Sequence, residues 1–153
     1  MNYPKISTII LNWNGLNDTI ECIKSVKAID YPNYEMIVVD NGSTDNSEKV
    51  LREKFPTTTL IQNGDDLGYA EGNNRGIYYA LNRGAEYILI LNNDTKLEKS
   101  CLSELIVVAN DNPEMGILGP IAYDYFEQDK LLATNYYFDW NKLKTRSSVM
   151  PTS

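Results

Sequence analysis

Apolar residues along this chain gather into short runs, and most of these runs stop abruptly at polar side chains. The runs are rich in β-branched residues and too short for ordinary helices, which predicts buried strands. They cover Ile6–Leu11, Tyr34–Val39, Thr58–Ile61, Tyr87–Leu91 and Met115–Leu118. Because the run Tyr87–Leu91 is unbroken, we expect its strand to be covered on both faces.

Between these runs, apolar residues recur at helical spacing. Two of the four predicted helices open at Asp18-Thr19-Ile20-Glu21 and Asp45-Asn46-Ser47-Glu48, which have the form of capping boxes. The third follows the glycine-spaced segment 68–76, with Gly84 placed as a C-cap glycine, and the fourth stops at Asn112-Pro113. The alternation of strands and helices predicts an α/β fold with a mostly parallel sheet flanked by helices.

The pattern of residue types changes after Gly119-Pro120. Residues 121–126 and 132–140 alternate aromatic with polar side chains and predict a C-terminal β-hairpin, with its loop at 127–130. The last residues, 142–153, contain few apolar side chains, and we expect them to fray. No linker precedes residue 119, so residues 1–153 are expected to form a single domain.

Three of the predicted strands end in side chains of one chemical kind: Asn12-Trp13-Asn14, Asp40-Asn41 and Asn92-Asn93-Asp94. The carboxyl ends of parallel strands share one edge of a sheet, so these groups should converge on one crevice, where ligands bind. A carboxylate flanked by amides suits Mg²⁺ or Mn²⁺, which bring phosphates with them. The alternative is that the last motif only forms a turn.

The side chains at the other strand ends suit a nucleotide. Asp40 and Asn41 carry the acceptors and donors that a base or ribose needs. Trp13 is suited to packing on a base or sugar, and equally suited to the core. The glycines at 68, 72 and 76 would let backbone approach a ligand, although neither the dinucleotide nor the P-loop fingerprint is present. Arg75 is expected either to contact phosphate or to be a solvated helix residue.

Composition excludes several other classes. The 153 residues include 14 basic and 21 acidic side chains, and the net charge of −7 argues against a nucleic-acid partner. The absence of histidine excludes Ser-His or Cys-His catalysis and His-ligated zinc. Cys22 and Cys101 are interpreted as reduced thiols in or near the core. Without a signal peptide or a long apolar run, we expect a cytoplasmic protein, free or at the cytoplasmic face of the membrane.

Four ordered segments resemble family 2 glycosyltransferases, and most of all the rhamnosyltransferase-type branch that builds bacterial and archaeal surface polysaccharides. They are 7–14, 38–45, 68–76 and 91–94, and the resemblance covers about residues 5 to 140. It implies the Rossmann-like GT-A fold and a nucleotide-diphosphate sugar donor. It also implies a divalent metal and inverting transfer to a glycan or lipid-linked acceptor.

Carried over residue by residue, the resemblance implies a donor site. Asp94 matches the last acid of the family's D-x-D motif, which binds metal on the donor diphosphate. Asn92 stands where many members have the first Asp, which leaves one charge fewer on the metal, and Asn73 stands where others carry an Arg. Asp40 and Asn41 match the pair beside the base and ribose. The implied nucleotide-sugar-binding residues are Leu11, Asn12, Trp13, Asp40, Asn41, Gly68, Asn73, Asn74, Asn92 and Asn93, with Asp94 on the metal.

Members of this family continue beyond the matched part, and the continuation supplies the acceptor site and a catalytic carboxylate. We therefore expect the chain to be a donor-binding part, truncated before the acceptor-binding region. No catalytic base is assigned, since Asp124, Asp129 and Asp139 merely fall in the hairpin region.

Two other interpretations remain beside the transferase. One is a catalytically incomplete nucleotide-binding or interaction module, which a turnover assay would distinguish. The other, a nucleotide-sugar pyrophosphorylase, is disfavoured because the loop Asn12–Gly15 lacks the glycine-rich, Lys/Arg-containing pattern. Apolar surface on the hairpin Tyr123–Trp140 would favour a homo-oligomer. The residues do not identify the sugar, the base or the acceptor.

Overall fold

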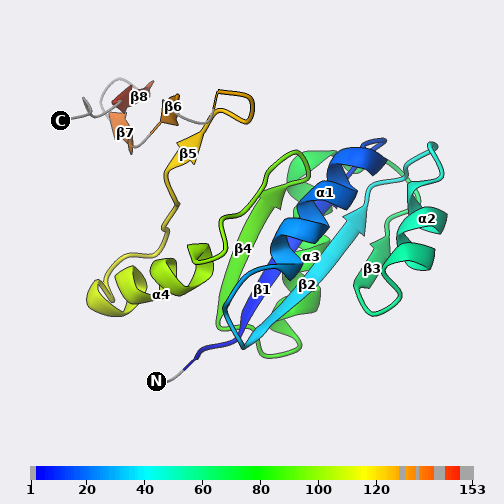
Figure 1. The fold of residues 1–153 in the computed structure, drawn as a ribbon, viewed down its shortest axis with the longest axis horizontal. Helices are drawn as coiled ribbons and strands as arrows, with labels where there is room; N and C mark the ends of the chain where they lie inside the picture. The colour runs from blue at the N-terminus through cyan, green and yellow to red at the C-terminus, as the bar shows by residue number, and fades with distance from the viewer. Residues whose placement is uncertain (1–2, 128–129, 134, 140–143, 149–153) are drawn as a thin grey trace. The chain divides into compact units, whose positions relative to one another are not determined.

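The computed structural model describes residues 3–127, 130–133, 135–139 and 144–148, which form two compact units (Figure 1). The first unit spans Met1–Ser103 and the second Glu104–Ser153. Every residue predicted to bind donor or metal belongs to the first unit.

The first unit is built on a four-stranded parallel sheet with the order β3-β2-β1-β4. Its strands are β1 (Ile6–Asn12), β2 (Tyr34–Asp40), β3 (Thr59–Gln62) and β4 (Tyr87–Asn92). The helices are α1 (Leu16–Lys27), α2 (Ser47–Lys54), α3 (Gly68–Leu81) and α4 (Cys101–Asp111), the last of which crosses into the second unit. The predicted α/β fold with a parallel sheet is confirmed.

The order of the strands creates a switch point. The chain first extends the sheet in one direction, from β1 to β2 to β3, and then crosses back to place β4 on the free side of β1. In open α/β sheets ligands bind outside the carboxyl ends of the strands at such a reversal. The crevice expected from topology therefore lies between the ends of β1 and β4.

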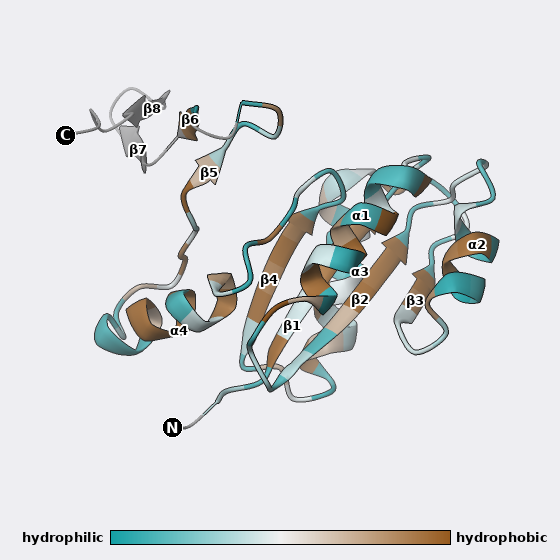
Figure 2. Ribbon diagram, in the orientation of Figure 1, coloured by the Kyte–Doolittle hydropathy of each residue, from teal (hydrophilic) through white to brown (hydrophobic). Residues whose placement is uncertain are grey.

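Helices cover both faces of this sheet, with α1 in front and α3 behind in the view of Figure 1. Ile9, Ile37, Val39 and Ala80 are fully buried between α3 and the sheet. Figure 2 shows the strands as mostly apolar, with polar positions on the outer sides of the helices. The third predicted helix is confirmed, but its expected start is wrong: α3 begins at Gly68, so the glycine-spaced segment 68–76 lies within the helix and does not precede it. Gly84 has the left-handed φ of +80° expected after its end.

Two of the three glycines expected to approach a ligand instead bring α3 close to the sheet. A Cβ on Gly72 would come within 2.6 Å of Leu11 Cδ1, and one on Gly76 within 2.7 Å of Ile9 Cγ2. The expectation that their backbone faces a ligand is therefore wrong. Gly68, which has open space around its Cα, is the member of the set to which that expectation still applies.

The predicted capping of α1 is wrong. The helix begins at Leu16, so Asp18 lies within its first turn, and the N-cap residue Gly15 has no side chain to contribute. The first N–H groups are instead satisfied by side chains outside the helix: Gly15 N donates to Asn12 Oδ1, at the end of β1, at 3.3 Å, and Leu16 N donates to Asp45 Oδ2 at 3.3 Å. The capping box predicted for α2 is also wrong, because its N-cap residue is Asn46, which makes no side-chain capping hydrogen bond. Asp45 instead accepts hydrogen bonds from the backbone N–H and the hydroxyl of Ser47, the first residue of the helix.

The strand β4 is less covered than its apolar sequence predicts. It is an edge strand of the described sheet, and Ile90 is 45% exposed whereas Leu91 is buried. The reason is positional: Gly72 and Gly76 set α3 over β1 and β2. The expectation of full cover on both faces is wrong for this strand.

The second unit contains two short antiparallel pairs. β5 (Ala122–Tyr123) pairs with β6 (Leu131–Ala133), which confirms the predicted hairpin over a shorter stretch than expected. Residues 135–139, expected in the second strand of that hairpin, instead form β7 (Asn135–Asp139), which pairs with β8 (Lys144–Ser148). The fraying expected from residue 142 onward is therefore wrong for β8, while 142–143 and 149–153 lie outside the described residues.

The strand predicted at Met115–Leu118 is absent from the described structure, where Ile117 is 93% exposed. Pro and Gly residues on both sides and within this segment disfavour a ladder of hydrogen bonds. No helix in the described part of the chain is long and apolar enough to cross a membrane.

Candidate functional site

The polar ends of the strands meet at one edge of the sheet, as the sequence predicts. Asn12, the last residue of β1, lies level with Asp40 of β2, which in turn lies level with Gln62 of β3. On the other side, Leu11 lies level with Asn92 of β4. The four carboxyl ends thus present a continuous row of amide and carboxylate groups.

The lower layer of this edge is a buried hydrogen-bond network. Asn12 Nδ2 donates to Asp40 Oδ2 at 2.7 Å, and Asn12 Oδ1 accepts from the Thr19 hydroxyl at 2.8 Å. Asp40 Oδ1 accepts from Gln62 Nε2 at 3.0 Å and from Ser43 N at 2.9 Å. Asn12, Thr19 and Asp40 are completely buried. Such satisfied networks rigidify their surroundings, so these side chains hold the loops of the site.

Asn93 extends the same network to β4. Its Nδ2 donates to the Thr19 hydroxyl at 3.1 Å and to Gly15 O at 3.4 Å. Since Thr19 donates to Asn12, the hydrogen bonds run without a break across the ends of all four strands. The side chain of Asn93 is therefore turned back into the protein.

Asn41 ties the end of β2 to the loop that follows β3. It is buried, and its backbone N–H donates to Asn12 O at 2.8 Å. Its side-chain amide donates to Asp66 Oδ1 at 2.5 Å and accepts from Asn63 Nδ2 at 2.9 Å. Both the nitrogen and the oxygen of this side-chain amide therefore have hydrogen-bond partners within the protein.

Above the buried layer lies an exposed one. Trp13 is 57% exposed, so the core interpretation of this residue is wrong. Asn92 and Asp94 are exposed at the end of β4, and Tyr69 is 60% exposed at the start of α3. These side chains are the ones that a ligand at the switch point would meet.

The remaining predicted donor-binding residues lie in or under α3. Gly68 is its exposed first residue, with a φ of +74°, while Leu11 and Asn74 are half-buried. Asn73 is buried and donates from Nδ2 to Tyr69 O at 2.9 Å, and its Oδ1 has no hydrogen-bond partner among the described residues. Arg75 pairs with Glu71 at 3.2 Å on the exposed side of the helix, as a solvated helix residue would.

Asp94 is the carboxylate available for a metal ion. It is exposed, and none of the described residues donates a hydrogen bond to its side chain. Nor do three or more His, Cys, Asp or Glu side chains gather into a metal-binding group anywhere in the described ranges. One carboxylate fits Mg²⁺ or Mn²⁺ in a site where substrate phosphates and water supply the other ligands.

Cys22 lies beneath this carboxylate but has no nucleophilic role. Its thiol donates to Asn92 O across 3.7 Å, and burial together with the negative charge of Asp94 raises its pKa to about 12. The thiol therefore stays protonated at neutral pH, which makes it inert.

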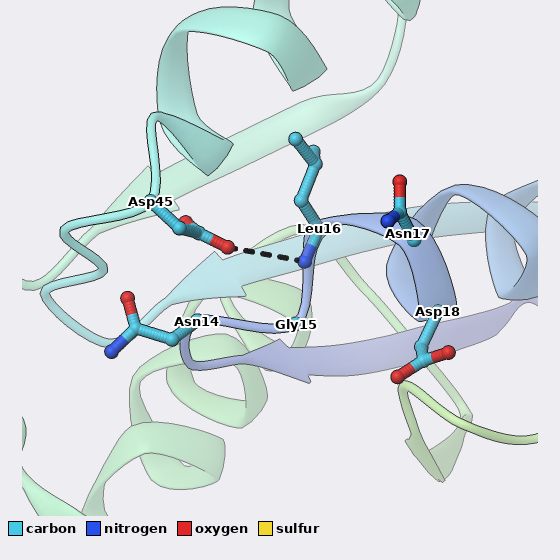
Figure 3. Close-up of a pocket in the computed structure, with 6 residues that line it drawn as sticks. All are labelled: Asn14, Gly15, Leu16, Asn17, Asp18 and Asp45. Carbon is cyan, nitrogen blue, oxygen red and sulfur yellow. Dashed lines mark hydrogen bonds between the residues drawn. The ribbon is translucent and has the colours of Figure 1, made fainter.

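A hollow of about 310 Å³ lies at the start of α1, lined by Asn14, Gly15, Leu16, Asn17, Asp18 and Asp45 (Figure 3). Burial would raise the pKa of Asp45, but hydrogen bonds from Ser47 and Leu16 outweigh it, and the net pKa is lowered. The ionised Asp45 and the exposed Asp18 make this hollow unfavourable for a diphosphate.

Sequence reasoning missed four residues of the site: Thr19, Ser43, Gln62 and Tyr69. Thr19 carried a signal, since it is a polar side chain beside the buried face of α1, next to Ile20. Nothing in the local sequence distinguished Ser43 or Gln62, because their partners come from other elements. Tyr69 was visible only as an aromatic residue after Gly68.

A parallel sheet with helices on both faces and polar strand ends at its switch point defines a Rossmann-like α/β domain. The sequence profile described as "Glycosyl transferase family 2" matches residues 7–149. The chain belongs to this family of glycosyltransferases.

Two relatives illustrate the match. Glycosyltransferase GlyG of Streptococcus pneumoniae is 27% identical over 136 residues, which cover 87% of this chain and 42% of GlyG. The N-acetylglucosaminyl-diphospho-decaprenol L-rhamnosyltransferase of Mycobacterium tuberculosis is 26% identical over 97 residues, which cover 58% of this chain and 32% of that enzyme. The chain thus spans less than half the length of these relatives.

The fold is shared with a solved mannosyltransferase, PcManGT from Pyrobaculum calidifontis, in complex with GDP-Man and Mn²⁺. The TM-score is 0.63 at 24% identity, over 69% of this chain and 32% of the mannosyltransferase. This likeness bears out the predicted GT-A-like fold.

Proposed function

We propose that this chain binds the nucleotide-diphosphate sugar donor of an inverting glycosyltransferase, together with Mg²⁺ or Mn²⁺, for polysaccharide or glycan synthesis. The observation that carries the proposal is the exposed Asp94 carboxylate beside Asn92, at the switch point of the sheet. The GDP-Man and Mn²⁺ bound by PcManGT support it.

In this proposal Asp94 holds the metal ion. A bound divalent ion would stabilise the charge that develops on the leaving diphosphate. The exposed ring of Trp13 offers a surface for the base, and Gly68 allows backbone to approach the donor. Asn12, Asp40 and Asn41 lie below this surface and fix the loops on which it is built.

Within the family we place the chain in the rhamnosyltransferase-type branch, with a glycan or lipid-linked acceptor. The support is the motif resemblance together with the match to the mycobacterial rhamnosyltransferase. We assign no catalytic base. Backbone hydrogen bonds from Glu127 and Phe126 lower the pKa of Asp124, which makes it a poorer proton acceptor.

The test is nucleotide binding with and without metal. Calorimetry with UDP, dTDP and GDP is expected to show at least one nucleotide that binds about tenfold or more tightly with Mn²⁺ than with EDTA. Asp94→Asn should abolish the metal-dependent part, because it removes the carboxylate from the metal. Asp18→Asn, at the acidic hollow, is the matched control and should bind like the wild-type chain. Equal affinity with Mn²⁺ and with EDTA would contradict the proposal.

A further inference from the structure

Tyr69 and Asn92 are joined by a hydrogen bond that links α3 to the end of β4. The Tyr69 hydroxyl donates to Asn92 Oδ1 at 3.1 Å, although the two residues are exposed and lie on different elements. Two features place Tyr69 there. Gly68 adopts a φ of +74° just before it, and Asn73 Nδ2 donates to its carbonyl oxygen at 2.9 Å.

This bond decides which end of the Asn92 amide faces the site. Oδ1 is engaged by Tyr69, while no residue in the described part of the chain accepts a hydrogen bond from Nδ2. An amide NH₂ group carries two donors and no lone pair for a hard cation, which binds oxygen ligands. Asn92 thus presents hydrogen-bond donors, and no metal-binding oxygen, beside the Asp94 carboxylate.

We propose that Tyr69 is a positioning residue, which orients Asn92 to donate a hydrogen bond to an oxygen atom of the diphosphate-sugar donor. The metal ion is then left to Asp94 alone among the three residues Asn92, Asn93 and Asp94. This inference rests on the proposed function and deepens it, because it adds Tyr69 as the residue that sets which atoms of Asn92 face the donor.

The charges around the site favour such a role. Asp65, Asp66 and Asp94 are exposed acids near the predicted donor site, and the chain has a net charge of −7. Arg75, the cation on α3 near this edge, is paired with Glu71 on the exposed side of the helix. Diphosphate oxygens are acceptors, so a fixed amide donor supplies an attraction that these acids cannot.

The experiment is a double-mutant cycle on the full chain. Wild-type protein, Tyr69→Phe, Asn92→Ala and the double variant are titrated by calorimetry with UDP, dTDP and GDP in Mn²⁺. Tyr69→Phe should weaken nucleotide binding about three- to tenfold, the effect of one neutral hydrogen bond. In the Asn92→Ala background the Tyr69→Phe change should alter nucleotide affinity by less than twofold, because no amide remains for Tyr69 to orient. Tyr78→Phe, at another exposed tyrosine of α3, is the matched control and should leave binding unchanged.

A second pair of measurements separates substrate from metal. Binding of Mn²⁺ alone should be the same in Tyr69→Phe and wild-type protein. Asn92→Asp should weaken nucleotide binding, since it replaces a donor with an acceptor, whereas a metal-ligating role predicts tighter Mn²⁺ and nucleotide binding. Circular dichroism and thermal unfolding should be alike in all variants, because both side chains are exposed.

The outcomes distinguish the two proposals. Equal losses from Tyr69→Phe in both backgrounds, or tighter binding by Asn92→Asp, would overturn the positioning role while leaving the proposed function intact. If the wild-type chain binds none of the three nucleotides, the proposed function is wrong and the role of Tyr69 is overturned with it.

Discussion

Asp40 combines two properties that are rarely found together, complete burial and a carboxylate. Three protein groups donate hydrogen bonds to it, from Asn12, Ser43 and Gln62. A buried carboxylate is tolerated when its oxygens are satisfied in this way, and removal of the acceptor leaves the donors without partners. Asp40 therefore holds the loops around the site in place through these hydrogen bonds.

We expect Asp40→Ala to lower the free energy of unfolding by about 3 kcal/mol, since buried donors lose a charged acceptor. Urea denaturation monitored by circular dichroism measures this. Asp65→Ala, at an exposed acid, is the control and should stay within about 0.5 kcal/mol of wild type. A loss below 1 kcal/mol for Asp40→Ala would show that the network contributes little net stability.

The sequence predicted which polar residues end the strands, but it did not predict how deeply their side chains are buried. Asn12, Asp40 and Asn93 look like ligand-binding residues in the sequence, because polar groups at the carboxyl end of a strand face the crevice. Their partners Thr19 and Gln62 lie on other elements, and only the assembled sheet brings them within hydrogen-bond distance. For Trp13 the sequence left both interpretations open, and exposure decided between them.

At the scale of elements, α3 depends on close approach to the sheet. A Cβ on Gly76 would lie 2.7 Å from Ile9 Cγ2 and 3.0 Å from Val39 Cγ2, and both methyl groups belong to stiff β-branched side chains. Gly72 faces the more flexible end of Leu11. Gly76 is therefore the stricter of the two requirements.

Gly76→Ala should destabilise the protein by about 1–3 kcal/mol through overpacking. The direction of the change in stability is informative, because Gly→Ala in an unobstructed helix stabilises a protein by about 1 kcal/mol. Thermal and urea unfolding measure the change. Gly116→Ala, where nothing lies within 4 Å of the added Cβ, is the control and should leave stability unchanged. A more stable Gly76→Ala variant would mean that α3 can shift away from the sheet without cost.

The elements that the sequence predicted well are those set by local periodicity: the four strands of the parallel sheet at nearly their observed bounds, and the presence of four helices. The start of α3 was not predicted, because the glycine-spaced segment expected to precede the helix forms its first turns. The prediction errors occur where residues distant in the sequence determine the local structure. Asp45 and Asn12 satisfy the start of α1, so no local capping box was needed. The edge position of β4 leaves part of an apolar strand exposed.

At the scale of the whole molecule, the predicted donor site is confined to one unit. All its residues precede Ser103, and the second unit contributes none of them. A fragment ending at Asp111, which keeps α4 whole, is expected to bind nucleotide with Mn²⁺ within about threefold of the full chain. Calorimetry on both proteins checks this, with circular dichroism to establish that the fragment folds. A loss beyond tenfold in a folded fragment would show that the second unit contributes to the site.

The strand order also determines when the site can form. Of the four strands in the described sheet, β1 is synthesised before the others and its neighbour β4 after them, and Ile6 pairs with Tyr87. Contacts so distant in sequence form slowly, and domains begin to fold while synthesis proceeds from the N-terminus. Until Tyr87–Asn92 has emerged, one edge of β1 stays unpaired and open to pairing with other chains. Completion of the predicted donor site is therefore a late step in the folding of this unit, and a nascent chain that lacks β4 combines an aggregation-prone edge with an incomplete site.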